Sequence, residues 1–179
     1  MSAPAYAVFD TPIGHCAIVW RGAAIAGVQL PEASAAATAR RVGQRFTGVV
    51  RELPPPFVLR AIAAIGQLLR GGGDELAAIE LDYAGQGPFH RRVYELARAI
   101  PAGATLTYGE LAARAGEPGA ARAVGQAMAR NPYPLIVPCH RVLAAHGGAG
   151  GFSARGGVAT KFRLLRIEGA VRQQALALG

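Results

Sequence analysis

The first third of the chain alternates short apolar runs with turn residues, a pattern that predicts strands joined as hairpins. Extended runs cover residues 6–9, 15–20 and 24–30, and turn-forming residues separate them at 10–14 and 21–22. Gly and Pro in these turns supply the backbone conformations that tight connections need. We therefore expect a small antiparallel sheet at the N-terminus.

Longer apolar patterns with helical spacing follow the hairpins. They predict helices over residues 33–46 and 57–69, with the triple proline at 54–56 as a rigid connector between them. Residues 76–83 are interpreted as a further strand. The Gly- and Pro-rich stretch 85–88 is interpreted as a domain boundary.

Beyond residue 86 the pattern is helical. One helix face recurs at Phe89, Val93, Leu96, Ala97 and Ile100. Thr107 and Glu110 have the spacing of a capping box, which opens a short helix that ends near Gly116. A second helix is expected from Pro118, in its first turn, to Met128. Two short helices joined by a glycine-containing turn form a candidate helix-turn-helix.

Charge separates the chain at the same boundary. Residues 1–86 hold 7 Arg and 7 acidic residues, whereas residues 87–166 hold 10 Arg and 1 Lys against 3 acidic residues, so this segment carries the whole net charge of +8. This asymmetry favours a polyanionic partner such as nucleic acid over the alternative, a generally basic surface. We expect an α+β chain with an N-terminal α/β domain, residues 1–86, and a mainly helical domain, residues 87–179.

Composition excludes several classes of protein. The two cysteines, Cys16 and Cys139, are too few for a disulfide framework, and with four scattered His they show no metal-ligand spacing, so no metal or cofactor is expected. Residues 1–7 lack the pattern of a signal peptide, and no apolar run approaches the roughly 18 residues of a membrane helix. A cytoplasmic protein is expected. The Ala, Gly and Arg bias with a single lysine, Lys161, is attributed to genome base composition.

Cys139 is the candidate nucleophile. It stands between Pro138 and His140, directly after the apolar run 135–137. A thiol reacts as its thiolate, and a neighbouring imidazole can take its proton. The alternative from these residues alone is an inert buried cysteine. Cys16 lies in an alternating strand without a basic neighbour and is interpreted as a core residue.

The segment around Cys139 resembles the signature of the O6-alkylguanine-DNA alkyltransferase family. It reads Pro-Cys-His-Arg-Val at residues 138–142, after Asn131-Pro132 and before a Gly-rich loop and a Leu-Leu…Glu-Gly helix. Further matches occur at residues 120–125, 107–112, 88–89 and, more loosely, 11–14. The resemblance covers residues 87–170 closely and the N-terminal part faintly.

The resemblance implies a DNA repair protein that flips a damaged guanine out of the duplex and takes its alkyl group irreversibly onto Cys139. O6-alkylguanine would be the substrate, with O4-alkylthymine as a further candidate. It also implies that His140 activates the thiol through a water and that Glu168 orients the imidazole. Asn131 would be the hinge to the active-site strand, and Tyr108 would crowd a phosphate, help to expel the base and donate a proton to the leaving guanine.

The resemblance also implies how DNA is held. Arg122 would enter the duplex in place of the flipped nucleotide, and Ala121 would belong to the small-residue face of a recognition helix in the minor groove. Arg130 and Ser153 are further expected DNA contacts. The implied fold is a ribonuclease H-like N-terminal domain and a helix-turn-helix C-terminal domain, in a monomer that binds double-stranded DNA and no membrane.

The sequence departs from the common family pattern at several positions. Phe152 stands where many members carry Tyr, and the loop 153–157 is slightly long. Tyr94 replaces a frequent Trp, and Arg91 lies near a position that is often Gln. These departures concern the range of substrates rather than the reaction.

Two other functions remain as alternatives. A non-catalytic lesion-binding relative would flip the base without transfer, but such proteins lack the acceptor that Cys139 supplies. A helix-turn-helix regulator of transcription would not need the residues 138–141, and it would usually carry a dimerisation element, which the sequence does not reveal.

Overall fold

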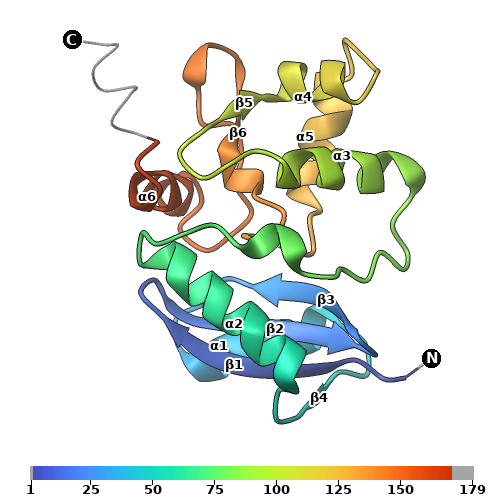
Figure 1. Cartoon of the computed structure of the whole chain (residues 1–179), viewed down its shortest axis with the longest axis vertical. Coiled ribbons are helices and arrows are strands. Elements are labelled where there is room, and N and C mark those ends of the chain that lie inside the picture. Colours follow the sequence, from blue (N-terminus) through green and yellow to red (C-terminus); the bar gives the residue numbers. More distant parts are fainter. Residues whose placement is uncertain (1, 171–179) are drawn as a thin grey trace. The chain divides into compact units, whose positions relative to one another are not determined.

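A computed structural model describes residues 2–170 of the 179-residue chain, which form two compact units. The first unit runs to Ala84 and also includes Pro132–Ile136, and the second comprises Gly85–Asn131 and the residues from Val137 onward. Helices and strands occur in both units, so the fold is α+β (Figure 1).

The first unit is built on a four-stranded sheet. Its strands are β1 (Ala5–Thr11), β2 (Gly14–Arg21), β3 (Ala24–Gln29) and β4 (Val50–Arg51), in the order β3-β2-β1-β4. The three hairpin strands are confirmed, but β4 pairs with β1 in parallel, so the expectation of a purely antiparallel sheet is wrong. A helix carries the chain back between β3 and β4, which is the connection that parallel pairing requires.

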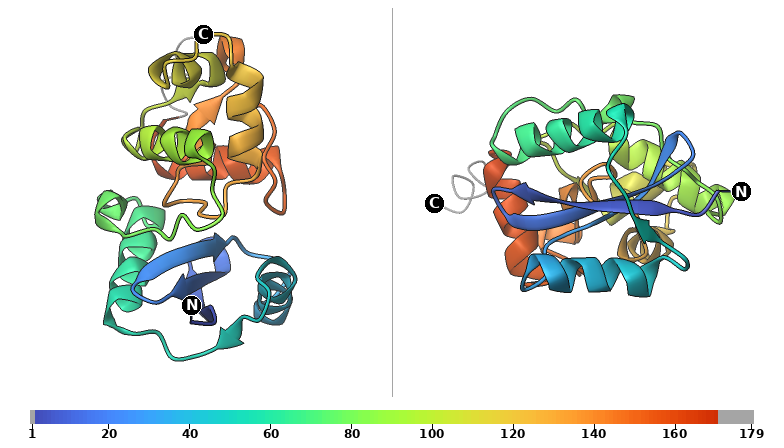
Figure 2. Two further views of the ribbon diagram at one scale, coloured as in Figure 1. Left: turned by 90° about the vertical axis from the view of Figure 1, so that its right-hand side faces the viewer. Right: turned by 90° about the horizontal axis from the view of Figure 1, so that it is seen from below.

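Two helices cover opposite faces of this sheet, α1 (Ala35–Arg45) and α2 (Pro56–Leu69), as the right-hand view of Figure 2 shows. Because successive strand residues point to opposite faces, β2 must bury side chains in both directions. Ala17 and Val19 pack in one cluster with Val42 of α1, and five consecutive residues of β2 are buried. The burial of both faces of the sheet by helices therefore explains the apolar run in this strand.

The predicted strand at residues 76–83 is wrong. The structure has a short 3-10 helix, η1 (Leu76–Ala78), followed by a single parallel bridge between Leu81 and Ile25. Leu76 and Leu81 are buried, but the residues next to Leu81 are the polar Glu80 and Asp82. The backbone of this segment pairs only on either side of Ile25, whose amide donates to Glu80 and whose carbonyl accepts from Asp82, so a single bridge forms in place of a strand.

The second unit is mainly helical. Its elements are α3 (Pro88–Arg98), β5 (Leu106–Thr107), α4 (Tyr108–Arg114), α5 (Ala121–Ala129), the 3-10 helix η2 (Cys139–Arg141), β6 (Val142–Leu143), the 3-10 helix η3 (Ala145–Gly147) and α6 (Val158–Ile167). The apolar face of α3 is confirmed, with Val93 and Ala97 fully buried. The strands β5 and β6 form a two-residue parallel pair, which is too short to leave a periodic signal in the sequence.

Two sequence signals around α4 and α5 have different outcomes. The capping box is confirmed, because the Glu110 amide donates to Thr107 Oγ1 over 3.1 Å and the Thr107 amide donates to Glu110 Oε2 over 2.7 Å. The start of α5 at Pro118 is wrong, because the helix begins at Ala121. Gly119 has a φ of +92°, a left-handed conformation that ends the preceding turn before a helix can form.

Tyr94 joins two helices of this unit. Its hydroxyl donates to the carbonyl of Ala127 over 2.8 Å, and its ring is fully buried. The tyrosine thus satisfies its polar atom inside the core and links α3 to α5.

None of the helices that the structure describes within residues 2–170 is long and apolar enough to cross a membrane.

We predict that Gly27→Ala destabilises the first unit. A Cβ at Gly27 would clash with the ring of Phe46 and lie 3.1 Å from the carbonyl oxygen of Pro132, so the cost should be about 1–3 kcal/mol. Gly43→Ala is the matched control, because that helix position has open space, and it should stabilise the protein by about 0.5–1 kcal/mol. Urea unfolding measures both, and equal effects at the two positions would contradict the packing argument.

Candidate active site

A single turn of 3-10 helix carries three neighbouring polar side chains into the second unit. The Arg141 amide donates to the carbonyl of Pro138 over 2.9 Å, and the Cys139 amide donates to that of Val137 over 2.8 Å. Cys139, His140 and Arg141 are all buried, with 8%, 1% and 1% of their surface exposed. A buried polar side chain needs a partner, so this turn requires compensating groups elsewhere.

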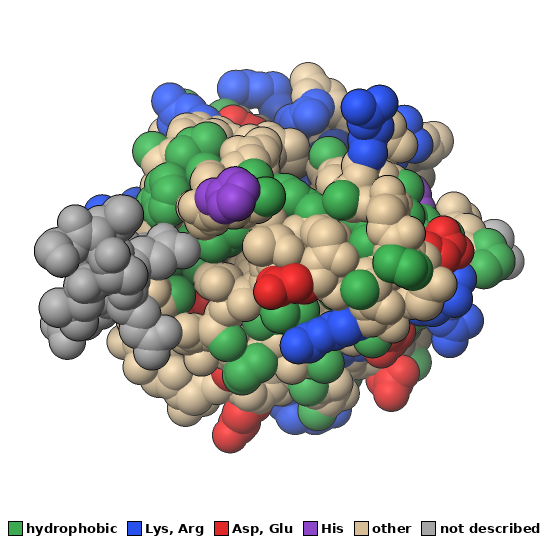
Figure 3. Space-filling view, turned by 90° about the horizontal axis from the view of Figure 1, so that it is seen from above, with side chains coloured by type: hydrophobic (Ala, Val, Ile, Leu, Met, Phe, Trp, Pro, Cys, Tyr) green, Lys and Arg blue, Asp and Glu red, His purple; other side chains and the backbone are tan. Residues whose placement is uncertain are grey.

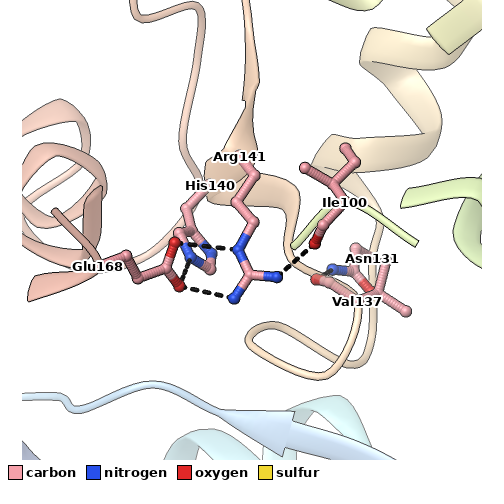
Figure 4. A network of polar contacts seen from close by, with 6 residues as sticks. All are labelled: Ile100, Asn131, Val137, His140, Arg141 and Glu168. Carbon is pink, nitrogen blue, oxygen red and sulfur yellow. Dashed lines mark hydrogen bonds and ion pairs between the residues drawn. The ribbon is translucent and has the colours of Figure 1, made fainter. Parts of the chain in front are cut away.

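Glu168, the residue that ends α6, supplies those partners (Figure 4). His140 Nε2 lies 2.7 Å from Glu168 Oε1. The Arg141 guanidinium binds the same carboxylate through two hydrogen bonds, with Nε donating to Oε2 over 3.0 Å and Nη2 donating to Oε1 over 2.8 Å. Its Nη1 donates to the carbonyl of Ile100 over 2.6 Å, just beyond the end of α3. The predicted contact of His140 with Glu168 is therefore present in the structure.

The network fixes the charge of Glu168. Burial by itself raises the pKa of this carboxyl, but hydrogen bonds and positive charge from His140 and Arg141 outweigh it and lower the pKa from 4.5 to about 2. An ionised carboxylate only accepts hydrogen bonds, so Nε2 of His140 must be the donor. The other ring nitrogen, Nδ1, is buried and has no hydrogen-bond partner among residues 2–170. In the neutral ring Nδ1 is then the atom that can accept a proton.

Cys139 is held as a neutral thiol with two groups ready to stabilise its anion. Burial raises the pKa of the Cys139 thiol, while a hydrogen bond from Asn131 and the charge of Lys161 lower it in part. Asn131 follows α5 and also donates from Nδ2 to the carbonyl of Val137 over 2.9 Å. Asn131 thus links the end of α5 to the turn that carries the thiol, but this turn is 3-10 helix and not the strand that we expected.

The thiol opens onto a pocket of about 390 Å³, which we call the thiol pocket. Its walls include Tyr108, Gly125, Met128, Cys139, Phe152 and Ser153. Burial, and then the charge at Cys139, raise the pKa of Tyr108, so its phenol stays protonated at neutral pH. Gly150 lets the loop pass over the tyrosine, because a Cβ there would lie 2.7 Å from the Tyr108 hydroxyl oxygen.

A second hollow of about 560 Å³, which we call the α4–α5 groove, lies on the same unit. Its walls include Thr107, Tyr108, Ala121, Arg122, Gln126 and Ala144. Tyr108, Gly125 and Ala129 border both hollows. Of the expected DNA contacts, Arg122 and Ala121 border the groove, Ser153 borders the thiol pocket, and Arg130 is exposed at the end of α5.

Sequence reasoning missed two buried cations. The sequence pattern gives Arg141 no role beyond its place in the motif, although its guanidinium donates two hydrogen bonds to Glu168. Lys161 was attributed to base composition, yet its ammonium is fully buried and donates to the carbonyl of Val142 over 2.7 Å and to the Tyr108 hydroxyl over 3.4 Å. The available signal was that Lys161 is the only lysine in an arginine-rich chain.

Cys16 differs from Cys139 in its surroundings. It is fully buried in β2, which confirms the core interpretation, and burial raises its pKa to about 11 against a lowering by Thr11. Such a thiol is unreactive near neutral pH. Among the described residues 2–170, no group of three or more His, Cys, Asp or Glu side chains could hold a metal ion.

Comparison with known proteins identifies relatives for most of the chain. The family described as "6-O-methylguanine DNA methyltransferase, DNA binding domain" matches residues 88–170. The methylated-DNA–protein-cysteine methyltransferase of Mycobacterium leprae is 38% identical over 164 residues, covering 89% of this chain and 88% of that protein. The protein of the same name from Methanothermobacter thermautotrophicus is 43% identical over 116 residues, covering 65% of this chain and 64% of that protein.

The fold is also found among solved structures. The crystal structure of Mycobacterium tuberculosis OGT in complex with DNA matches with a TM-score of 0.69 and 33% identity, over 92% of each chain. The similarity therefore extends over both units and is not confined to the residues around Cys139.

The depressed pKa of Glu168 predicts how stability depends on pH. A carboxyl whose pKa is lower when folded contributes stability above its ordinary pKa and loses that contribution as the pH falls from about 5 towards 2. Glu168→Gln should lower the free energy of unfolding at pH 7 by about 3 kcal/mol, because it leaves Arg141 buried without its charge partner. It should also flatten the acid loss of stability.

Urea unfolding at several pH values between 7 and 3 tests this expectation. The control is Glu117→Gln, since Glu117 is half exposed and its pair with Arg92 is 3.6 Å long, and its effect should stay below about 1 kcal/mol. An acid dependence in Glu168→Gln as steep as in the parent would show that another group is responsible.

Proposed function

Because the chain belongs to the methylated-DNA–protein-cysteine methyltransferase family, we propose that it repairs DNA by moving an alkyl group from O6-alkylguanine to its own Cys139. One observation carries the proposal: Cys139 borders the thiol pocket, while its neighbour His140 is oriented by Glu168. A thiol that opens onto a pocket, next in sequence to an oriented base, supports covalent transfer, because a cysteine nucleophile needs a base to take its proton. The size and mainly apolar walls of the pocket suit a flipped base.

The proposed alkyl transfer consists of two proton transfers and the exchange of one bond at the alkyl carbon. The Cys139 proton passes, through a water, to Nδ1 of His140, and Glu168 stabilises the imidazolium that forms. The thiolate sulfur then bonds to the alkyl carbon while the bond from that carbon to guanine O6 breaks. The guanine leaves as an anion and takes the proton of Tyr108. The product is a thioether that no group of the site can cleave, so each molecule acts once.

The nucleophile argues against a binding-only role. A protein that recognised the lesion without transfer would have no use for a thiol next to an imidazole and a buried carboxylate. A regulator of transcription would need only the helices α4 and α5. Both alternatives leave the coupled burial of Cys139, His140 and Glu168 unexplained.

We propose that α4 and α5 act as a helix-turn-helix that binds double-stranded DNA through the α4–α5 groove. Figure 3 shows Lys and Arg side chains gathered along one margin of a face whose middle is mainly hydrophobic and backbone surface, with acidic and basic side chains interspersed. Such a margin suits phosphates, and small residues such as Ala121 suit close approach to a groove of DNA. The related M. tuberculosis protein, which was crystallised with DNA, supports this assignment.

Within this scheme Arg122 and Tyr108 act on the base before chemistry begins. Arg122 is exposed at the groove and would fill the space that the flipped nucleotide leaves. Tyr108 borders both hollows, so it stands where a base would pass from the duplex to the thiol. Arg130 and Ser153 are assigned to further contacts with the DNA and the base.

O4-alkylthymine is a second candidate substrate. The N-terminal unit is assigned to the ribonuclease H-like class.

The first functional prediction concerns the acceptor. Intact-mass spectrometry after mixing with a duplex that contains O6-methylguanine should show the mass of one added methyl group, on a peptide that contains Cys139. Cys139→Ala should take up no methyl group but retain DNA binding, whereas Cys16→Ala should react normally because that thiol is inert. Methyl uptake by Cys139→Ala would refute the assignment.

The second functional prediction separates base flipping from chemistry. Extruding a stacked base costs a few kcal/mol, but a free base such as O6-benzylguanine avoids this step. Arg122→Ala should therefore slow repair of duplex DNA by about 10- to 100-fold and leave the reaction with the free base nearly unchanged. Free O6-methylguanine replaces the benzyl compound if the pocket is too narrow.

The matched control is Arg114→Ala, which removes an exposed arginine of α4 that does not border the groove. It should change duplex repair by less than about threefold, through phosphate attraction alone. Equal losses on both substrates for Arg122→Ala would show that this arginine does not act in flipping.

A further inference from the structure

We propose that Arg141 is a positioning residue for alkyl transfer: its guanidinium fixes the Glu168 carboxylate, and through it the direction of the His140 imidazole that is to activate Cys139. The inference rests on the proposed function and assigns a role to a side chain that the proposed mechanism does not yet use. At Glu168 one carboxylate accepts hydrogen bonds from two residues of the same turn.

Glu168 lies at the end of a helix, where a side chain is ordinarily free to rotate. Here Oε1 accepts from both His140 and Arg141, over 2.7 and 2.8 Å, and Oε2 accepts from Arg141 Nε over 3.0 Å. Two parallel bonds from one planar guanidinium fix the plane of the carboxylate. A single bond from His140 would leave the carboxylate free to rotate about that contact, so the imidazole would lose its fixed direction.

The guanidinium is itself anchored at its other edge. Arg141 Nη1 donates to the carbonyl of Ile100 over 2.6 Å, just beyond the end of α3. Arg141 therefore joins three parts of the unit: its own 3-10 turn, the end of α6 and the segment after α3 (Figure 4). A lysine could offer the charge but not this planar set of donors, because its ammonium is a point charge on a flexible stem.

Charge balance supports the same role. With a neutral imidazole, the buried group of His140, Glu168 and Arg141 carries no net charge, since the carboxylate and guanidinium cancel. Beside the larger effect of burial, the charge of Lys161 lowers the pKa of the Cys139 thiol, and the charge at Cys139 in turn raises the pKa values of Tyr94 and Tyr108. A proton moved from Cys139 to His140 then creates one new ion pair in the site instead of adding to an excess of negative charge.

Three variants of the full chain test the proposal: Arg141→Met, Arg141→Lys and Arg141→Met combined with Glu168→Gln. Single-turnover reaction with O6-benzylguanine, or with free O6-methylguanine if the larger base does not enter, gives a maximal rate constant and a half-saturating concentration. Rates are expressed per molecule that reacts at completion, which removes any misfolded fraction. Loss of an orienting partner costs on the order of 10- to 100-fold, so this fall is expected in the maximal rate constant of Arg141→Met.

The half-saturating concentration and the affinity for duplex DNA should stay within about twofold, because Arg141 borders neither the thiol pocket nor the α4–α5 groove. Arg141→Lys should keep a charge partner for Glu168 without the planar set of donors, and it should react at an intermediate rate. Adding Arg141→Met to Glu168→Gln should lower the rate by less than about threefold more, since residues that act through one partner are not additive.

The matched control is Arg21→Met, which removes an arginine from the ion pair of Arg21 Nη1 with Asp82 Oδ2, 2.6 Å long, in the first unit. It should cost stability without changing the rate of transfer per active molecule. A parental rate in Arg141→Met and Arg141→Lys would overturn the proposal. So would a full multiplicative loss in the double variant, or a weakened half-saturating concentration with an unchanged maximal rate.

Failure of this inference is distinguishable from failure of the proposed function. If the unaltered chain takes no alkyl group from the duplex or from the free base, the proposed function is wrong. If the unaltered chain reacts and the Arg141 variants react equally fast, only the role of Arg141 is wrong.

Discussion

The buried carboxylate of Glu168 is the constraint on which the second unit depends. A carboxylate taken out of water is unstable unless opposite charge and hydrogen bonds surround it, and removal of one partner is then strongly destabilising. Arg141 and His140 meet that demand from a single 3-10 turn. The end of α6, the turn with Cys139 and the carbonyl of Ile100 consequently converge on one point, and the thiol is placed as a result.

Local interactions explain which parts of the fold the sequence predicts. The hairpins and the Thr107 capping box depend on residues a few positions apart, so their patterns are legible along the chain. The parallel pairing of β4 and the single bridge at Leu81 depend instead on which distant strand is available. The late start of α5 has a local cause, but the left-handed backbone at Gly119 competes there with a proline that suits a helix start equally well.

The site shows the same division. Cys139 and His140 are neighbours in sequence, so the residues alone suggested a nucleophile with its base, beside the alternative of an inert buried cysteine. Glu168 lies 28 residues from His140, and only the resemblance to a family suggested their contact. Arg141 and Lys161 escaped because an arginine or lysine is ordinarily solvated, and nothing in the sequence shows that these two are buried.

Burial of the thiol keeps it unreactive until a substrate occupies the site. In the proposed function the nucleophile reacts once, so reaction with any other electrophile would inactivate the protein. Burial raises the pKa of Cys139, which keeps the thiol protonated and unreactive. The Asn131 hydrogen bond and the Lys161 charge oppose that rise, so the anion is accessible once a proton acceptor and substrate are both in place. In the proposed mechanism the proton acceptor is always present, because Glu168 fixes the tautomer of His140, whereas the substrate arrives only as a base that has left its stack. If the proposed function holds, the reaction of the thiol is limited by entry of a base into the thiol pocket.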